Sequence, residues 1–139
     1  MKNSKRGVVF FAYLSHNWKQ LSRHTTLVYD VVDLNIGNGY DKSTGKFTAP
    51  SNGTYMFYVS TGAFDRSHAS VELIVNGNIR NTAWADSMNH SDRTFVTTVT
   101  PVILLKGDVV FTRIGEKYGG NLIESNQYIR TSFSGINIY

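Results

Sequence analysis

The sequence predicts an all-β protein, a sandwich or barrel of antiparallel strands. Short runs of β-branched and aromatic residues recur along the 139 residues, and aromatic residues reach 13%. Glycine and asparagine separate these runs, as turn formers do. No segment has the periodicity of an amphipathic helix, and the best candidate, residues 15–23, is too short. Without helices to make parallel crossovers, the sheets are expected to be antiparallel.

The expected strands follow one another at short spacing, which is typical of sandwiches and barrels. In chain order they cover residues 8–14, 27–34, 54–61, 71–75, 95–105, 109–111 and 129–139. Asn76-Gly77 suits a two-residue hairpin turn, because both residues tolerate positive φ. Lys106-Gly107-Asp108 is expected to reverse the chain once more. We find no repeat or linker, so residues 7–139 are expected to form one domain after a disordered or artificially added lead of residues 1–6.

Turn formers alternate closely with large aromatic residues between positions 40 and 57. Thr44-Gly45 and Ser51-Asn52-Gly53 are expected to form turns, because glycine permits positive φ where a chain reverses tightly. The aromatic residues between them are expected to anchor the core from short strands: Tyr40, Phe47, Tyr55 and Phe57. Such residues are poor candidates for ligand contacts.

The first expected strand is apolar on both faces. Its side chains alternate, so that Val8, Phe10, Ala12 and Leu14 face one way and Val9, Phe11 and Tyr13 face the other. One face of an antiparallel sandwich strand normally meets water and is polar. A second covering surface is therefore expected, supplied by another subunit or by a loop or the N-terminal tail.

Composition excludes several classes of function. The net charge is +4, but lysine and arginine are scattered apart from Lys2, Lys5 and Arg6. The charge could draw the domain toward anionic surfaces, yet no basic stripe with stacking aromatics indicates nucleic-acid binding. The absence of cysteine excludes disulfides, thiolate metal sites and a cysteine nucleophile. No apolar run reaches the roughly 18 residues that would insert in a membrane, and no secretory signal peptide is visible.

A gapped pattern of residues carries a resemblance to a known family. Four residues separate Asn35 from Tyr40, six separate Tyr40 from Phe47, and Gly-x-Tyr-x-Phe begins five residues later at Gly53. This pattern resembles the signature of the globular head domain of complement C1q, a trimeric jelly roll akin to the tumour necrosis factor fold. The stretches "VVFFAYLS", "LLKGDVV" and "SFSGINIY" also resemble it. The matching positions are Phe10, Asn35, Tyr40, Phe47, Gly53, Tyr55, Phe57, Gly107, Asp108, Phe133 and Gly135.

Two positions depart from the family's signature. Tyr29 stands where the signature has a phenylalanine, which is a mild change. Val59 stands where the signature ends with an aromatic residue, and we expect Tyr58 to fill the space or the packing to be looser there.

The resemblance implies a secreted, extracellular, antiparallel jelly-roll β-sandwich that forms a homotrimer. It implies pattern-recognition or lectin-like binding of microbial or glycan surfaces in innate immunity. The alternative is a tumour-necrosis-factor-like or synaptic-organiser-like ligand that binds a receptor protein. Because fold does not fix function, both interpretations stay open.

Enzyme motifs are absent, and we expect no catalytic activity. The sequence has no Gly-x-Ser-x-Gly elbow, no phosphate-binding glycine-rich loop and no His-Glu-x-x-His pair. His16, His24, His68 and His90 share no metal-ligand spacing. Asp65, Ser67 and His68 lie too close in sequence for the geometry of a catalytic triad.

Two segments are expected to be surface loops with binding residues. In residues 81–93, Trp84 could stack on a sugar ring or pack over the end of the sandwich. In residues 115–122, Lys117 and Tyr118 could meet an anionic group, and Arg66 and His68 could add to a basic rim.

No cofactor is required on this interpretation, although calcium could bind. Asp86 and Asp92 carry the oxygen ligands that calcium prefers, and the resemblance implies calcium near a three-fold axis in some relatives. The alternative is that both aspartates serve turn chemistry. Asn52 and Asn89 begin glycosylation sequons, which matter only in a chain secreted by a eukaryote.

Overall fold

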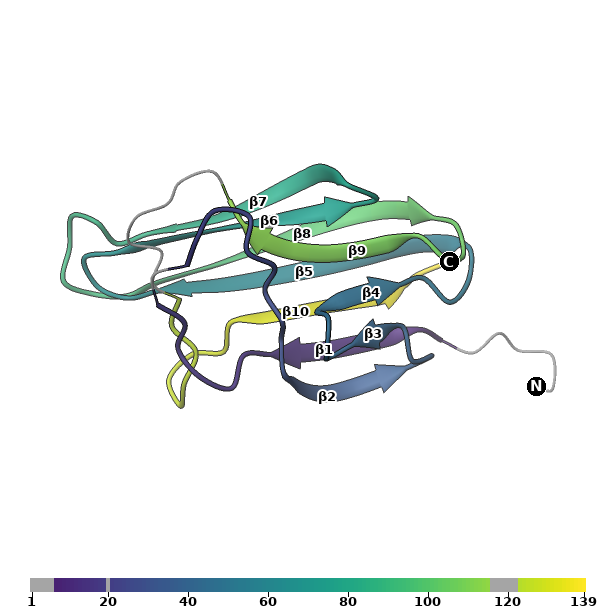
Figure 1. The fold of residues 1–139 in the computed structure, drawn as a ribbon, viewed down its shortest axis with the longest axis horizontal. Helices are drawn as coiled ribbons and strands as arrows, with labels where there is room; N and C mark the ends of the chain where they lie inside the picture. Colours follow the sequence, from purple (N-terminus) through teal and green to yellow (C-terminus); the bar gives the residue numbers. More distant parts are fainter. Residues whose placement is uncertain (1–6, 20, 116–122) are drawn as a thin grey trace.

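Two five-stranded antiparallel sheets pack face to face in the computed structural model (Figure 1). The structure describes residues 7–19, 21–115 and 123–139. The strands of these residues are β1 (Val9–Tyr13), β2 (Val31–Ile36), β3 (Tyr40–Asp41), β4 (Lys46–Thr48), β5 (Gly53–Ala63), β6 (His68–Val75), β7 (Asn78–Asp86), β8 (Thr94–Leu104), β9 (Val109–Ile114) and β10 (Ser132–Asn137). Among these residues no helix is long and apolar enough to span a bilayer.

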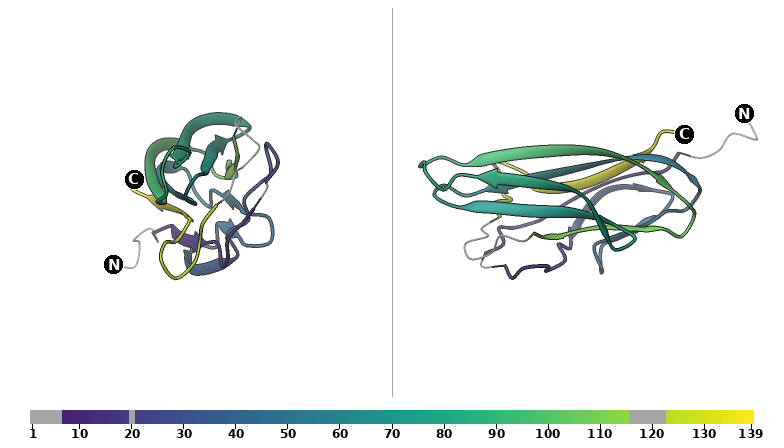
Figure 2. Two further views of the ribbon diagram at one scale, coloured as in Figure 1. Left: turned by 90° about the vertical axis from the view of Figure 1, so that its left-hand side faces the viewer. Right: turned by 90° about the horizontal axis from the view of Figure 1, so that it is seen from above.

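The strand order of both sheets is that of a sandwich with long-range pairings. One sheet, called sheet A here, has the order β2-β1-β10-β5-β8, and the other, sheet B, has the order β3-β4-β9-β6-β7. Figure 2 shows the elongated sandwich from one end and from above. The predicted antiparallel all-β class is therefore confirmed.

The expected strand at residues 27–34 is divided between the two sheets. Thr26 forms an isolated bridge with Arg113, and the Leu27 N–H donates to the Thr112 carbonyl, both in β9 of sheet B. The chain then crosses to sheet A, where β2 pairs with β1. A single apolar run thus serves two layers, which its residue pattern alone does not reveal.

The prediction of a loop at residues 81–93 is wrong for residues 81–86, which belong to strand β7. Residues 81–86 complete the hairpin that begins at Asn76-Gly77, where both residues have positive φ as predicted. The inward side chains of β7 are the fully buried alanines Ala83 and Ala85. Its remaining side chains are mostly polar, so the segment has little intrinsic strand propensity, and pairing with the buried β6 decides its conformation.

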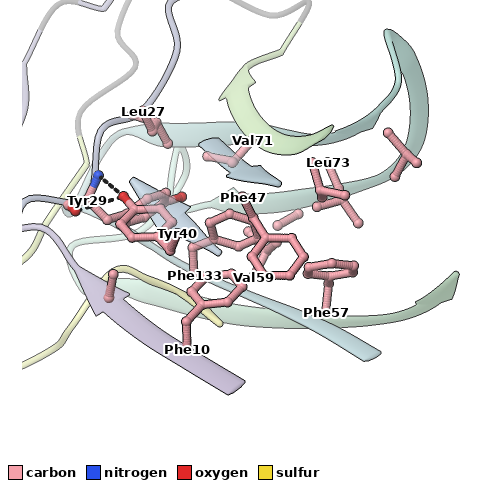
Figure 3. Close-up of a cluster of buried hydrophobic side chains, with 14 of the residues drawn as sticks. Phe10, Leu27, Tyr29, Tyr40, Phe47, Phe57, Val59, Val71, Leu73 and Phe133 are labelled. Atoms are coloured by element: carbon pink, nitrogen blue, oxygen red, sulfur yellow. Dashed lines mark hydrogen bonds between the residues drawn. The ribbon is translucent and has the colours of Figure 1, made fainter. Parts of the chain in front are cut away.

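The core is built around the aromatic residues that the sequence pattern indicates (Figure 3). The Phe10 ring stacks on Tyr40 at 5.2 Å and on Phe47 at 4.9 Å, and meets Phe133 edge-on at 4.9 Å. A Cβ at Gly135 would lie 2.7 Å from ring atoms of both Phe10 and Phe57, so only a hydrogen fits there. Tyr55 and Phe57 are fully buried, and the predicted anchors are confirmed.

Four other signature positions shape the backbone at turns and close contacts. The Asn35 amide donates to the Tyr40 carbonyl at 2.8 Å and accepts from the Tyr40 N–H at 3.2 Å, which closes the turn between β2 and β3. Gly53 lies in β5 and not in a turn as predicted. A Cβ at Gly53 would collide with Asn137 and with the Tyr139 carbonyl, so glycine is needed for close approach. At the predicted reversal before β9, Gly107 has positive φ and Asp108 accepts from the Leu105 N–H.

The two departures from the signature have different structural consequences. Tyr29 is fully buried, and its hydroxyl lies 2.8 Å from the Thr112 hydroxyl, so the extra oxygen has a partner. Val59 points into the core, but Tyr58 points to the opposite side of β5 and is 38% exposed. Tyr58 therefore does not fill the space beside Val59, because adjacent residues of a strand face opposite ways.

Tyr29→Phe is expected to destabilise the fold by about 1–2 kcal/mol, because it leaves the buried Thr112 hydroxyl without its partner. Burial raises the pKa of Tyr29 and of Tyr40 above the usual range of a phenol, so both hydroxyls stay protonated. The Tyr40 hydroxyl donates to the Tyr29 backbone carbonyl, a contact that Tyr29→Phe leaves in place. Urea denaturation measures the change, and Tyr29→Phe combined with Thr112→Val should recover much of the loss. Equal stability of wild type and Tyr29→Phe would contradict this role.

Candidate functional site

The outer face of sheet A carries a large apolar surface. Cross-strand pairing places Val9 beside Ile36 and Ile136, and places Phe11 beside Leu34. We call this surface the sheet A face and define it by Val9, Phe11, Leu34, Ile36, Met56, Tyr58, Val99, Pro101, Ile103 and Ile136. None of these ten residues carries a charge. The second apolar side of β1 thus continues onto parts of β2, β5, β8 and β10.

A hollow of about 260 Å³ indents the sheet A face where β10 has small residues. Ser134 and Gly135 form its floor, between the large side chains of Phe11 and Tyr58. Ile103, farther out on the edge strand β8, is 78% exposed. Soluble monomers rarely expose contiguous apolar patches of this kind. The face therefore has the character of a docking surface. The sequence indicated this surface through β1, which is apolar on both of its faces. The residues that β2, β5 and β8 add to it were not predicted.

Trp84 lies on the outer face of sheet B, not in a loop as predicted. Its indole is 41% exposed and stacks on the His68 ring at 6.0 Å with an angle of 15° between the planes. His68 itself is only 1% exposed, and its Nδ1 lies 3.5 Å from the Met88 sulfur. His68 therefore does not belong to an accessible basic rim. It supports the indole from beneath, which holds the ring in one orientation.

The other predicted ligand contacts are distributed differently. Arg66 is exposed at the tip between β5 and β6, where it has positive φ and its N–H donates to the His90 carbonyl at 3.0 Å. Lys117 and Tyr118 lie outside the described residues. Arg66 and His68 are two positions apart, yet one is exposed and the other buried, so they do not form a common site.

The two aspartates expected to bind calcium serve the backbone of the β7–β8 connection. Asp86 accepts from the Met88 N–H at 2.9 Å, and Asp92 accepts from the N–H of Arg93 at 2.8 Å. In the described ranges, no three histidine, aspartate or glutamate side chains come close enough to hold a metal ion. A calcium ion shared between copies of the chain stays a prediction.

Comparisons with known proteins agree with this architecture. The family model described as "C1q domain" matches residues 9–138. The human protein named complement C1q tumor necrosis factor-related protein 3 is 30% identical over 109 residues, which are 78% of this chain and 43% of that protein. The mouse protein of the same name is 31% identical over 110 residues, with the same coverage. The chain thus spans less than half the length of these curated relatives.

Solved structures share the fold at lower sequence identity. The globular domain of zebrafish complement 1qA has a TM-score of 0.72 at 17% identity, over 95% of this chain and 98% of that one. Murine APRIL at pH 5.0 has a TM-score of 0.72 at 14% identity, over 96% of this chain and 100% of that one. These likenesses show the jelly-roll fold that the signature residues implied. Together with the family model, which matches nearly the whole chain, they lead to one assignment: the chain belongs to the C1q domain family.

Proposed function

We propose that this domain is a secreted, non-enzymatic recognition module that assembles as a homotrimer and binds glycans or microbial surfaces in innate immunity. The observation that carries the assembly is the sheet A face, which is apolar, uncharged and indented. Membership of the C1q domain family supports the trimer and the extracellular location. Each site alone would bind weakly, and three linked sites would provide avidity.

A second copy of the chain is the occupant that best fits the sheet A face. A charged partner would lose hydration over the apolar centre of this surface, where none of the ten defining residues could pair with its charge. The exposed residue Ile103 on the edge strand β8 and the hollow at Ser134 are two separate patches of the same sheet. A three-fold assembly suits this arrangement, because each copy in a ring contacts its neighbours through two different patches.

Trp84 is our proposed glycan contact. An indole presents a broad apolar face that can stack on a sugar ring, and the His68 ring beneath it reduces the ordering that binding requires. Trp84 lies on sheet B, so that assembly through sheet A leaves it accessible. Lys117 and Tyr118, and Arg66 on its exposed tip, are the next candidates if Trp84 is not the contact.

The trimer is tested by light scattering. Wild type at micromolar concentration is expected to have three times the monomer mass of 15.6 kDa. Tyr58→Glu places a charge at the centre of the sheet A face and is expected to yield folded monomers, since burial of an unpaired carboxylate is costly. Trp84→Ala, on the other sheet, is the matched control and should remain trimeric. A wild-type mass of one chain would refute the proposed assembly.

Glycan recognition is tested by an array of microbial and animal glycans probed with wild type and with Trp84→Ala. Binding by wild type that falls in Trp84→Ala, at unchanged trimer mass, supports the proposed contact. If Trp84→Ala binds glycans as wild type does, Lys117 and Tyr118 become the preferred candidates for the glycan contact.

The alternative function is that of a ligand for a receptor protein. It stays open because the C1q domain family, to which the chain belongs, does not by itself distinguish a glycan-binding module from a receptor ligand. A cell-surface receptor screen distinguishes the two functions, because a receptor ligand would bind a protein and leave the glycan array empty.

We propose calcium binding by Asp86 and Asp92 only at a site that several copies of the chain share. Such a calcium ion would offset repulsion among the gathered carboxylates and stabilise the trimer. Calorimetry with calcium should then show heat for wild type and none for the variant with both aspartates changed to asparagine. No heat with wild type would refute it.

A further inference from the structure

A second hollow is lined by residues of the β5–β6 and β7–β8 connections. These connections lie at the end of the sandwich opposite the C-terminus (Figure 1). The hollow has a volume of about 220 Å³, and it is lined by Phe64, Asp65, Ser91, Asp92, Arg93 and Glu124. Three segments that are far apart in the sequence contribute to it. Because none of its residues belongs to the sheet A face, the hollow is separate from the surface proposed for assembly.

Arg93 is held in a fixed orientation at this hollow. Its Nε donates to Glu124 Oε1 at 3.0 Å, and the Glu124 side chain is only 4% exposed. The guanidinium also lies over the Tyr128 ring, 5.1 Å from the centroid. The second oxygen of Glu124 accepts from the Asn126 amide at 3.0 Å. The position of the guanidinium is thus set before any ligand arrives, which lowers the entropy cost of binding.

The lining combines the groups that bind hydroxyl-rich molecules. The exposed carboxylates of Asp65 and Asp92 accept hydrogen bonds, the Ser91 hydroxyl donates and accepts them, and Arg93 donates them. Phe64 adds a half-buried aromatic side chain against which an apolar sugar face can lie. A sugar ring needs this mixture, because it carries several hydroxyls around an apolar ring face.

Charge and size restrict the ligand further. Among the described residues, the lining carries Asp65, Asp92 and Glu124 against Arg93, and Lys19 Nζ lies 6.0 Å from the centroid of the Phe64 ring. Three carboxylates thus face two cations, so the hollow is acidic although the whole chain has a net charge of +4. An acidic hollow disfavours sulfate, phosphate and sialic acid. Its volume of 220 Å³ is below the roughly 300–1,000 Å³ of common small-molecule pockets, which suits one sugar ring and not a longer chain.

We propose that this hollow binds a single neutral or amino-sugar ring at the end of a glycan, with Asp65, Asp92 and Arg93 as its hydrogen-bonding contacts. The inference rests on the proposed recognition function and adds to it a second contact, distinct from Trp84. Sugar hydroxyls would bind directly to the side chains and would need no metal ion.

The experiment is a titration of the isotope-labelled full chain with individual monosaccharides, followed by amide chemical shifts. Glucose, galactose, mannose, N-acetylglucosamine and glucosamine are the probes, with sialic acid as the anionic comparison. At least one neutral or amino sugar is expected to shift the amides of Asp65, Ser91 and Arg93 in a saturable way, and sialic acid is not. The shifts should persist in EDTA.

Asp65→Ala is expected to weaken that binding about tenfold, as the loss of a hydrogen bond from a charged acceptor does. Asp33→Ala removes another exposed carboxylate, on β2, and should change nothing. Saturable binding with this pattern supports the proposal. It is overturned if no sugar shifts these amides, if EDTA abolishes the shifts, if sialic acid shifts them equally, or if Asp65→Ala binds like wild type.

Failure of this inference is distinguishable from failure of the proposed function. Sugar-induced shifts confined to the surroundings of Trp84, in a chain of trimeric mass, would overturn the hollow and leave the recognition module standing. A monomeric mass and an empty glycan array would instead overturn the proposed function itself.

Discussion

Replacing Phe57 by alanine is expected to lower the free energy of unfolding by about 3–5 kcal/mol, the usual cost of truncating a buried phenylalanine. The Phe57 ring is fully buried, meets Phe47 edge-on at 5.6 Å, and stacks on Tyr55 at 6.1 Å and on Phe133 at 6.0 Å. Its removal leaves a cavity in the middle of the aromatic core, which these rings cannot close without leaving their own contacts. Thermal and urea denaturation of the purified chain measure the loss.

The matched control deletes an aromatic side chain that lies in solvent. Tyr139 is 85% exposed, so Tyr139→Ala should unfold within about 0.5 kcal/mol of wild type. If Phe57→Ala and Tyr139→Ala unfolded alike, Phe57 would not be a core anchor, and the interpretation of the signature aromatics would be wrong.

Arg113→Met is expected to destabilise the chain by about 3 kcal/mol, because it leaves a buried carboxylate without its counter-ion. Arg113 Nε lies 2.8 Å from Glu72 Oε1, and the side chains of Arg113 and Glu72 are 21% and 5% exposed. The pair joins the outer sides of β9 and β6, where the register sets the two residues opposite each other. Chemical denaturation at neutral pH gives the size of the effect.

The double variant Glu72→Leu with Arg113→Met tests the physical reason. Replacing a buried ion pair by apolar residues of similar size is often neutral or stabilising, so this variant should recover most of the stability. Arg80→Met, at an exposed arginine of β7, is the control for losing a positive charge. If the double variant were no more stable than Arg113→Met, the loss would come from Arg113 packing and not from the isolated Glu72 carboxylate.

The proposals assign different surfaces of one domain to different tasks. The sheet A face would hold the trimer together, whereas Trp84 on sheet B and the hollow beside Arg93 would contact glycans. Variants of one surface should therefore leave the others unchanged, as Tyr58→Glu and Trp84→Ala test for assembly and binding. Effects of well-separated residues on stability are usually additive as well.

The sequence by itself determined the fold class, the strands with strong periodicity and the aromatic core. Runs rich in aromatic and β-branched residues mark β5 and β8, and the Asn-Gly pair marks the β6–β7 hairpin, because these signals act between residues close together in the chain. The spacing from Asn35 to Phe57 placed the core anchors correctly. The role of the Asn35 side chain in closing the turn at Tyr40 came only from the structure, although the two residues are five positions apart.

Only the tertiary structure decided the candidate sites. Residues 81–86 have the composition of a loop, but β6 supplies their hydrogen-bond partners and makes them a strand, which moves Trp84 onto a sheet and buries His68 beneath it. Arg93 and Glu124 are 31 residues apart in sequence, and Glu72 and Arg113 are 41 apart. Such partners meet only after both sheets have formed and packed. Local propensity therefore carries no information on which carboxylate is buried beside which arginine, or on which loops enclose a hollow.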